Sequence, residues 1–180
     1  MPHPLHFAVA EEVHRQLNGC GELFRDSACG GGQRLPLFIG EFKGRDTRMC
    51  CADLLVVSTG QVRAIVEIEE SGFLPTKICG KFLQSALATH FIHKSQPEAA
   101  IPLSDCLLFV QVLDGSKCLK PGTRKHLQAQ LIEREIRNML PLKGSRAADY
   151  RLIFVCGVED REGLQSVGAA VSQYFTQSLL

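Results

Sequence analysis

Four carboxylates stand in or beside two apolar runs in the first half of the chain. Asp53 lies in the first run and Glu67 in the second, and Glu69 and Glu70 follow closely. Acids are poor strand formers and cost free energy to bury without a partner. Two such groups about 4 Å apart repel by roughly 1 to 4 kcal/mol, depending on how much water reaches them. A fold that gathers them therefore needs a compensating cation, either a basic side chain or a metal ion.

The segment between the two runs, residues 58–61, has the sequence Ser-Thr-Gly-Gln and is typical of a hairpin turn. Because successive side chains of a strand point to opposite faces, Glu67 and Glu69 share one face. An odd number of loop residues, such as a three-residue loop with Gly60 in the left-handed conformation, places Asp53 on that same face. We therefore predict that Asp53 and Glu67 lie within reach of one ion.

This pattern resembles the PD-(D/E)XK nuclease superfamily. The signature of that family is an acid early in one strand, a turn, and then (Asp/Glu)-x-Lys near the end of the next strand. Asp53 matches the first acid and Glu67 the second, while Ala52 replaces a frequent proline and Glu69 replaces the lysine. Some restriction enzymes of this group carry Glu-x-Glu at that point. The resemblance implies a restriction-endonuclease-like fold and a metal-dependent phosphodiesterase, foremost an endodeoxyribonuclease.

The resemblance also implies roles for individual residues. Asp53, Glu67 and the carbonyl group of Ile68 would hold Mg²⁺, with Mn²⁺ as the alternative, since such hard cations prefer oxygen ligands. The metal would lower the pKa of a bound water and stabilise charge on the scissile phosphate. Glu69 or a lysine would orient or deprotonate that water.

Three further residues are candidates through the resemblance. Lys77 and Lys81 lie one helical turn apart beyond the hairpin, and family members are known in which the lysine has moved onto the following helix. Lys81 is preferred because it lies further into the helix. Some members draw another active-site acid from their first helix, which makes Glu12 an additional candidate. The plain alternative for all three is a charged side chain on a helix surface.

The apolar periodicity predicts the elements that position these residues. We predict helices over residues 5–17, 76–93, 124–140 and 164–175, and strands over residues 35–42, 52–57, 62–68, 106–113 and 151–158. The last two strands read as buried on both faces. A single α/β domain, residues 1–180, follows, in which a three-strand meander leads through crossovers into a mixed central sheet flanked by helices. This is an αβββαβ core with an added α-β-α C-terminal part.

The net charge is only +1, yet basic residues gather in residues 117–146. Eight lysines and arginines stand there against Glu133 and Glu135: residues 117, 120, 124, 125, 134, 137, 143 and 146. Such a patch could follow a phosphate backbone, and a solvated helix face is the plain alternative. The expected nucleic-acid contacts are Lys120, Arg124, Lys125 and Arg137. Double-stranded DNA is the expected partner, with RNA and a homodimer left open.

The cysteines and the first residues of the sequence indicate the cellular compartment that we expect. The start of the sequence lacks the form of a signal peptide, and no apolar run approaches the roughly 20 residues of a membrane helix. We therefore expect a cytoplasmic protein with no membrane partner and no disulfides. Cys106 and Cys156 stand in apolar runs and read as core residues. A zinc site from the earlier cysteines, residues 20, 29, 50 and 51, lacks the C-x-x-C spacing.

Two other functions remain open at this stage. The absent lysine favours a non-catalytic nucleic-acid-binding or assembly module on a degenerate nuclease fold. A structural protein whose acids pair with Arg63 and nearby lysines is the third alternative. We favour the enzyme because four crowded acids are costly to keep without a cation.

Overall fold

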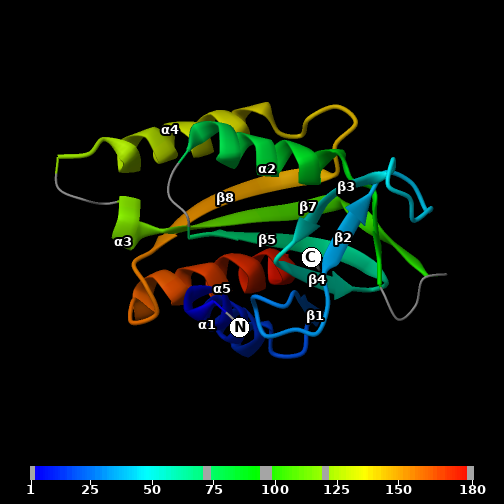
Figure 1. The fold of residues 1–180 in the computed structure, drawn as a ribbon, viewed down its shortest axis with the longest axis horizontal. Helices are drawn as coiled ribbons and strands as arrows, with labels where there is room; N and C mark the ends of the chain where they lie inside the picture. Colours follow the sequence, from blue (N-terminus) through cyan, green and yellow to red (C-terminus); the bar gives the residue numbers. More distant parts are fainter. Residues whose placement is uncertain (1–2, 71–73, 94–98, 119–121, 178–180) are drawn as a thin grey trace.

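The computed structural model describes residues 3–70, 74–93, 99–118 and 122–177. Eight strands in this part of the chain form one mixed sheet, and helices cover both of its faces (Figure 1). The predicted class, an α/β fold with a mixed central sheet flanked by helices, is confirmed.

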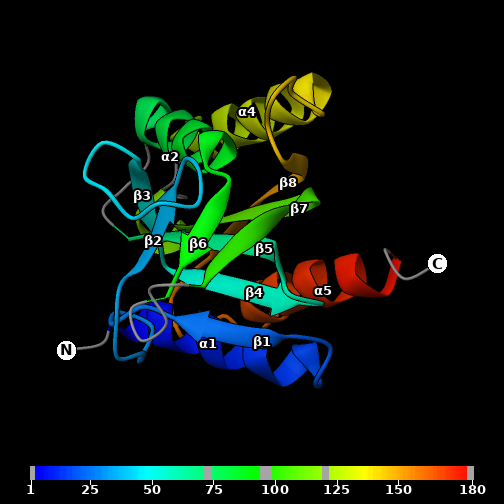
Figure 2. The same ribbon diagram turned by 90° about the vertical axis from the view of Figure 1, so that its right-hand side faces the viewer.

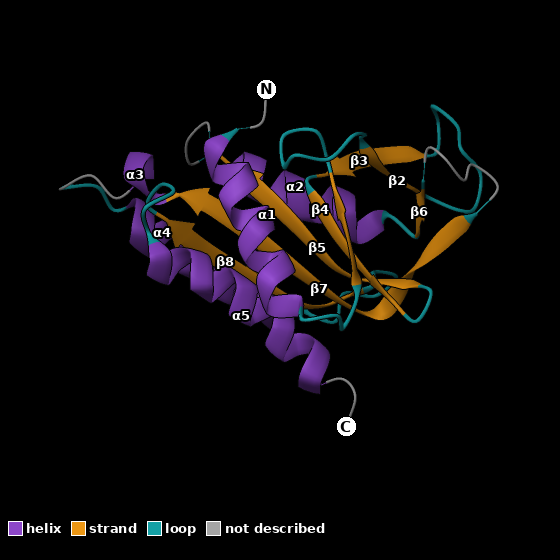
Figure 3. Ribbon diagram, turned by 90° about the horizontal axis from the view of Figure 1, so that it is seen from below, coloured by secondary structure: helices purple, strands orange, loops and turns teal. Residues whose placement is uncertain are grey.

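The centre of the sheet is an antiparallel meander followed by two parallel strands. The meander consists of β1 (Glu22–Arg25), β4 (Leu54–Ser58) and β5 (Gln61–Glu69). Strand β7 (Ala100–Asp114) pairs with β5 in parallel, and β8 (Ala147–Val155) pairs with β7 in parallel. The carboxyl ends of β5, β7 and β8 therefore lie at one end of the sheet, where Figure 3 shows α3 (Gly115–Cys118).

A second group of strands continues the sheet on the first part of β7. Strand β2 (Leu35–Phe38) pairs with β3 (Arg48–Ala52) and with β6 (His90–Ile92), and β6 pairs with β7. The prediction that the strand at 35–42 opens the meander is thus wrong. Its place is taken by β1, a segment for which the apolar periodicity predicts neither a strand nor a helix. Four residues are too few to show a period, so the pairing of β1 with β4 decides its structure.

Helices form two layers, one on each face. On one face α1 (Pro4–Leu17) and α5 (Arg161–Gln177) lie side by side (Figure 3). On the other face α2 (Pro75–Leu87) and α4 (Lys125–Met139) lie together (Figures 1 and 2). The helices predicted at 5–17, 124–140 and 164–175 are confirmed, because each carries an apolar face that packs on the sheet.

The alternation along β5 divides the core into two clusters. Ile65 belongs to the cluster under α2 and α4, whereas Ala64, Val66 and Ile68 belong to the cluster under α1 and α5. Burying one such aliphatic side chain stabilises the fold by roughly 1.5 to 3 kcal/mol. The opposite assignment of faces would expose these side chains and is therefore strongly disfavoured. Positions 67 and 69 must then face α2. The glutamates are thus placed by the apolar residues between them.

The predicted helix at 76–93 ends early. Helix α2 stops at Leu87, Ala88 is extended, and β6 follows. The aromatic and β-branched pair Phe91 and Ile92 is fully buried by pairing with β2 and β7, and this tertiary contact overrides the helical period. His90 and His93 therefore do not lie one helical turn apart.

Two strand predictions need correction as well. Strand β7 is longer than the predicted 106–113, and β8 spans 147–155 rather than 151–158 with alternating burial. Strand β8 pairs only with β7 among the described strands, so it forms an edge of the sheet rather than an enclosed central strand. Cys106 and Cys156 are exposed rather than buried, because Cys106 precedes a register shift of β7 and Cys156 follows the end of β8.

Candidate functional site

The β4–β5 hairpin brings Asp53 and Glu67 together. Thr59 and Gly60 have φ angles of 52° and 75°, which makes a two-residue turn of the kind that suits hairpins. The register then shifts by one residue after Val57, so that Arg63 is an extra residue on β5. Beyond this bulge Leu54 lies opposite Val66, which places Asp53 beside Glu67. The predicted odd parity comes from the bulge and not from a three-residue loop.

The bulge also turns Arg63 away from the acids. Its guanidinium lies 5.8 Å from the centre of the Phe175 ring of α5, on the opposite face of the sheet. This is a cation–π contact. The hypothesis that Arg63 neutralises the acids is therefore wrong.

Asp53 and Glu67 form a buried carboxylate pair. Glu67 is only 2% exposed, and burial together with the charge of Asp53 raises its pKa to about 8. Burial raises the pKa of Asp53, against the opposing effects of Lys81, the Ile68 N–H and His6. Both shifts have the same main cause, which is that charged carboxylates are poorly solvated here.

Two lysines of α2 face the glutamates of β5. The Nζ of Lys81 lies 2.8 Å from Glu67 Oε2, and the Nζ of Lys77 lies 2.7 Å from Glu69 Oε2. Four residues of helix span about 6 Å, and two residues of strand span about 6.6 Å. Lysines at i and i+4 of α2 therefore match glutamates at i and i+2 of β5. Burial lowers the pKa of Lys81, but Glu67 and Asp53 outweigh it and raise the pKa overall.

The start of α1 contributes two histidines that sequence reasoning missed. The Nε2 of His6 lies 3.8 Å from Asp53 Oδ2, and its Nδ1 lies 3.0 Å from Glu70 Oε1. The Nδ1 of His3 lies 3.5 Å from Glu70 Oε2. Burial raises the pKa of Glu70, but the contacts with both histidines lower it overall. The i, i+3 spacing of the histidines was a visible signal, but nothing local shows that this helix end meets the end of β5.

These side chains open onto one pocket of about 450 Å³. It is lined by His3, His6, Ala28, Asp53, Ile68, Glu69, Glu70, Lys77 and Lys81. The structure thus brings together Asp53, Glu67, Glu69, Lys77 and Lys81 at one end of the sheet. All five are residues that the sequence singled out.

Glu12 does not join this group. Its carboxylate contacts Arg15 and Gln16, both at 2.5 Å. It lies six residues after His6, about 9 Å further along α1. The prediction of Glu12 as an additional site acid is not supported by its position, and His6 is the α1 residue that meets Asp53.

The donor set of Asp53, Glu67 and the Ile68 carbonyl fits a hard divalent cation. The Ile68 N–H donates to Asp53 Oδ2 at 2.7 Å. Because the N–H and C=O of one strand residue point to the same edge, the carbonyl of Ile68 also faces the edge where Asp53 lies. Two adjacent carboxylates beside an oxygen of the main chain suit Mg²⁺.

The basic patch of residues 117–146 is partly neutralised by acids. Arg137 pairs with Asp149 at 3.3 Å, Arg146 pairs with Asp105, and Arg134 pairs with Glu135. Asp105 and Asp149 lie outside the segment in which the charges were counted. Lys120 lies outside the described residues. Arg124 and Lys125 stand at the start of α4, at the end of the sheet where β7 finishes (Figure 1).

A second basic region includes Cys51, which stands two residues before Asp53. Arg34, Lys43 and Arg48 line a pocket of about 470 Å³ together with Cys51. Among the described residues that line this pocket, none is an acid. Sequence reasoning missed it because the three residues come from β3 and from the segments on either side of β2.

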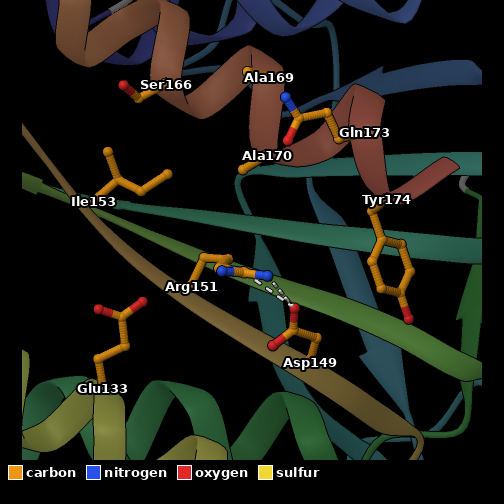
Figure 4. A pocket seen from close by; sticks show the side chains of 9 residues that line it. All are labelled: Glu133, Asp149, Arg151, Ile153, Ser166, Ala169, Ala170, Gln173 and Tyr174. Carbon is orange, nitrogen blue, oxygen red and sulfur yellow. Dashed lines mark hydrogen bonds and ion pairs between the residues drawn. The ribbon is translucent and has the colours of Figure 1, made fainter. Parts of the chain in front are cut away.

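The pocket in Figure 4, of about 430 Å³, is lined by charged side chains that already have partners. Arg151 points to Asp149 and lies 2.8 Å from it. Glu133 accepts a hydrogen bond from the main-chain N–H of Leu152 at 3.1 Å. The charges of this pocket are therefore engaged with one another or with the backbone, and it offers no set of groups aimed at a ligand.

The cysteines whose side chains are described are all unpaired. Cys29 is buried in the core under α1, and Cys50 lies against Ser85. Within the described residues, the one cluster of three or more potential metal-ligating side chains is His3, His6 and Glu70. A zinc site made from the cysteines is thus not supported.

Comparison with known proteins gives no relative. No family model, curated protein or solved structure matches the chain significantly. Among the described residues, none of the helices has the length and apolar character needed to cross a membrane.

Proposed function

We propose that the protein is a Mg²⁺-dependent nuclease that hydrolyses phosphodiester bonds, foremost a DNA endonuclease of the restriction-enzyme type. The observation that carries this proposal is the buried Asp53–Glu67 pair, whose pKa values are both raised by burial. Such a pair is costly unless a cation compensates it. With the strands β2, β3 and β6 set aside, the order α1, β1, β4, β5, α2 and β7 follows the αβββαβ pattern that the resemblance implies, and this supports the proposal.

Asp53, Glu67 and the carbonyl of Ile68 are the residues that would hold Mg²⁺. When bound, the ion lowers the pKa of a coordinated water and stabilises negative charge on a phosphate. The protein positions these ligands firmly, because Asp53 is tied to the main chain of β5 and Glu67 is enclosed by α2.

Lys81 takes the role of the lysine that the signature lacks. Because Glu67 and Asp53 raise its pKa, its side chain stays an ammonium ion at neutral pH. It is therefore suited to stabilise charge on the phosphate and to orient the attacking water, and it is unsuited to remove a proton. The pairing of Lys81 with Glu67, next to Asp53, favours it over Lys77.

Glu69 is the group that would accept the proton of the attacking water. It is only 5% exposed, lines the same pocket as Asp53, and is held by Lys77. A carboxylate held in one position by an ion pair can act as a general base once a water reaches it.

The basic pocket of Arg34, Lys43 and Arg48 supports a nucleic acid as the partner. It lies beside Cys51, two residues before Asp53. Positive charge next to the acidic site would hold the phosphate backbone and leave one phosphate at the acids.

The test is cleavage of plasmid DNA by the purified protein with Mg²⁺ and with EDTA. Glu67→Gln removes a metal ligand while it preserves shape, so we expect a loss of about 10²-fold or more. DNA binding and the far-ultraviolet circular dichroism spectrum should be nearly unchanged. The matched control Glu162→Gln, an exposed glutamate at the start of α5, should cleave like the wild type. Wild-type protein without cleavage in either Mg²⁺ or Mn²⁺, on DNA and on RNA, would overturn the proposal.

A non-catalytic nucleic-acid-binding module is the second candidate. The lysines favour it, because Lys81 and Lys77 already pair with Glu67 and Glu69 and so supply the compensating positive charge without a metal ion. In that case Glu67→Gln should not affect DNA binding and should leave thermal stability insensitive to Mg²⁺ in both proteins. Stabilisation of the wild type by Mg²⁺, lost in Glu67→Gln, would exclude this alternative.

A further inference from the structure

His3, His6 and Glu70 form a second cluster of metal-binding side chains at the edge of the pocket. One ligand atom of each lies within 4.8 Å of the others. We propose that these three residues bind a first-row transition-metal ion, with Zn²⁺ as the best match, at a site separate from Asp53 and Glu67. The inference depends only on this cluster and not on nuclease activity.

The spacing of the ligand atoms suits a tetrahedral ion. Two ligands bound at about 2.0 to 2.1 Å to a tetrahedral centre lie about 3.4 Å apart. The distances here are 3.0 Å from His6 Nδ1 to Glu70 Oε1 and 3.5 Å from His3 Nδ1 to Oε2, the other oxygen of the same carboxylate. Since one ligand atom of each residue lies within 4.8 Å of the others, side-chain rotation that brings them to about 3.4 Å would admit the ion.

The chemistry of the donors selects the type of ion. Imidazole nitrogen is a preferred ligand of Zn²⁺ and its neighbours in the first transition row, whereas Mg²⁺ and Ca²⁺ take oxygen ligands. Two histidines with one carboxylate are a donor set of zinc sites that keep the fourth position open. In this chain the three ligands line the same pocket as Asp53 and Lys77. A water or an anionic ligand can therefore reach the fourth position of the ion from this pocket.

The ligands are held in place before any ion binds. The main-chain N–H of His3 donates to the carbonyl of Ala28 at 3.2 Å, and its carbonyl accepts from Phe7 at 3.0 Å. The second ring nitrogen of His6 lies 3.8 Å from Asp53 Oδ2, so a small approach would let this carboxylate accept its hydrogen bond, as outer carboxylates do for metal-bound histidines. The positive end of the α1 dipole opposes a cation here, but the charges of Glu70 and Asp53 offset it.

The experiment is calorimetric titration of the metal-stripped, full-length protein with ZnCl₂ in excess Mg²⁺. We expect one zinc ion per chain. Removal of an outer-shell partner alone costs roughly 10- to 100-fold in metal affinity, so loss of a ligand in His3→Ala or His6→Ala should cost at least as much. His14→Ala, which changes an exposed histidine on the last turn of α1, is the matched control and should bind zinc like the wild type. Glu67→Gln should also keep its zinc affinity, whether or not the chain is a nuclease.

Cobalt substitution separates this site from the exposed cysteines. A site of two histidines and one carboxylate gives the visible bands of a tetrahedral Co²⁺ ion without the strong near-ultraviolet absorption of a thiolate ligand. His3 is largely exposed, so His3→Ala should retain the fold even if His6→Ala does not. The proposal is overturned if no zinc binds, if thiolate absorption accompanies the cobalt bands, or if folded His3→Ala binds zinc as tightly as the wild type.

Discussion

Glu67 is buried beside a second carboxylate, and this environment makes the free energy of unfolding depend on pH. Its pKa is about 8 in the folded protein and about 4.5 in the unfolded chain. Between these values the folded state holds a proton that the unfolded state has lost. The free energy of unfolding should therefore fall as the pH rises from about 4.5 to 8, by at most about 1.4 kcal/mol per unit for this group. Above pH 8 its contribution should stay constant.

Urea denaturation of the wild type and Glu67→Gln over this pH range measures the effect. Glutamine does not titrate, so the difference in unfolding free energy between the two proteins should shift steadily in favour of the variant as the pH rises. Asp53, whose pKa is also raised by burial, acts in the same direction and remains in both proteins. A constant difference would show that Glu67 titrates normally.

Lys81 gives a second prediction at the level of one side chain. Lys81→Met removes the cation that pairs with Glu67. Breaking a buried ion pair costs about 3 to 5 kcal/mol while the remaining group stays charged. Because Lys81 lowers the pKa of Glu67, Glu67 takes up a proton more readily in the variant, and this limits the loss. We therefore expect a larger loss at pH 9 than at pH 6, where Glu67 is protonated in both proteins. Chemical denaturation at the two pH values measures this.

Lys77→Met is the matched comparison for Lys81→Met. Its side chain is 38% exposed and can be replaced partly by water, so we expect a smaller loss of stability. Equal losses for the two variants would contradict the view that Lys81 is the main counter-charge of the buried pair.

At the level of the element, the hairpin turn sets the register that joins the acids. Gly60 has a φ angle of 75°, and a Cβ atom there would meet nothing within 4 Å. The cost of Gly60→Ala should therefore come from the backbone alone and amount to about 1 to 2 kcal/mol. Gly32 also has open space around it but no positive φ angle in this range, so Gly32→Ala should be neutral or slightly stabilising. Thermal or urea denaturation of both variants tests the difference.

The pairing of α2 with β5 is a property of two elements together. Lysines four residues apart on the helix meet glutamates two residues apart on the strand, because the two spacings are nearly equal in length. The elements run in opposite directions, so Lys77 meets Glu69 and Lys81 meets Glu67. A helix that began one residue later would turn both lysines away from the strand.

At the level of the whole molecule, the two basic regions lead to a prediction about nucleic-acid binding. On duplex DNA each lost phosphate contact should reduce the slope of log affinity against log salt by roughly 0.9. The double variant Arg34→Glu, Arg48→Glu should thus reduce it by roughly 1.8, through two contacts of about 0.9 each. The same measurement on Arg124→Glu, Lys125→Glu tests the patch at the start of α4.

The double variant Arg15→Glu, Arg161→Glu is the control for charge alone. Both arginines are exposed, and neither belongs to the patch of residues 117–146 or lines the pocket of Arg34, Lys43 and Arg48. If this control lowers the slope as much as the other two double variants, binding follows overall charge and neither region is a specific contact surface.

The sequence by itself determined the features that depend on neighbouring residues. The periods of the apolar residues were enough to predict α1, α4 and α5 and to place Glu67 and Glu69 on one face of β5. These features follow from local geometry, because the angle between successive side chains is set by the backbone of the element itself. The predicted class of mixed sheet follows from the same patterns.

Only the tertiary structure decided which distant side chains contact the acids at the end of β5. The contact between His6 and Glu70 joins residues 64 positions apart, and no local period carries that information. The bulge at Arg63, the place of β1 in the meander and the strand conformation of β6 likewise depend on pairing with distant strands. Short segments have too little intrinsic preference to choose a conformation, so the burial and hydrogen bonds that the rest of the fold offers them decide it.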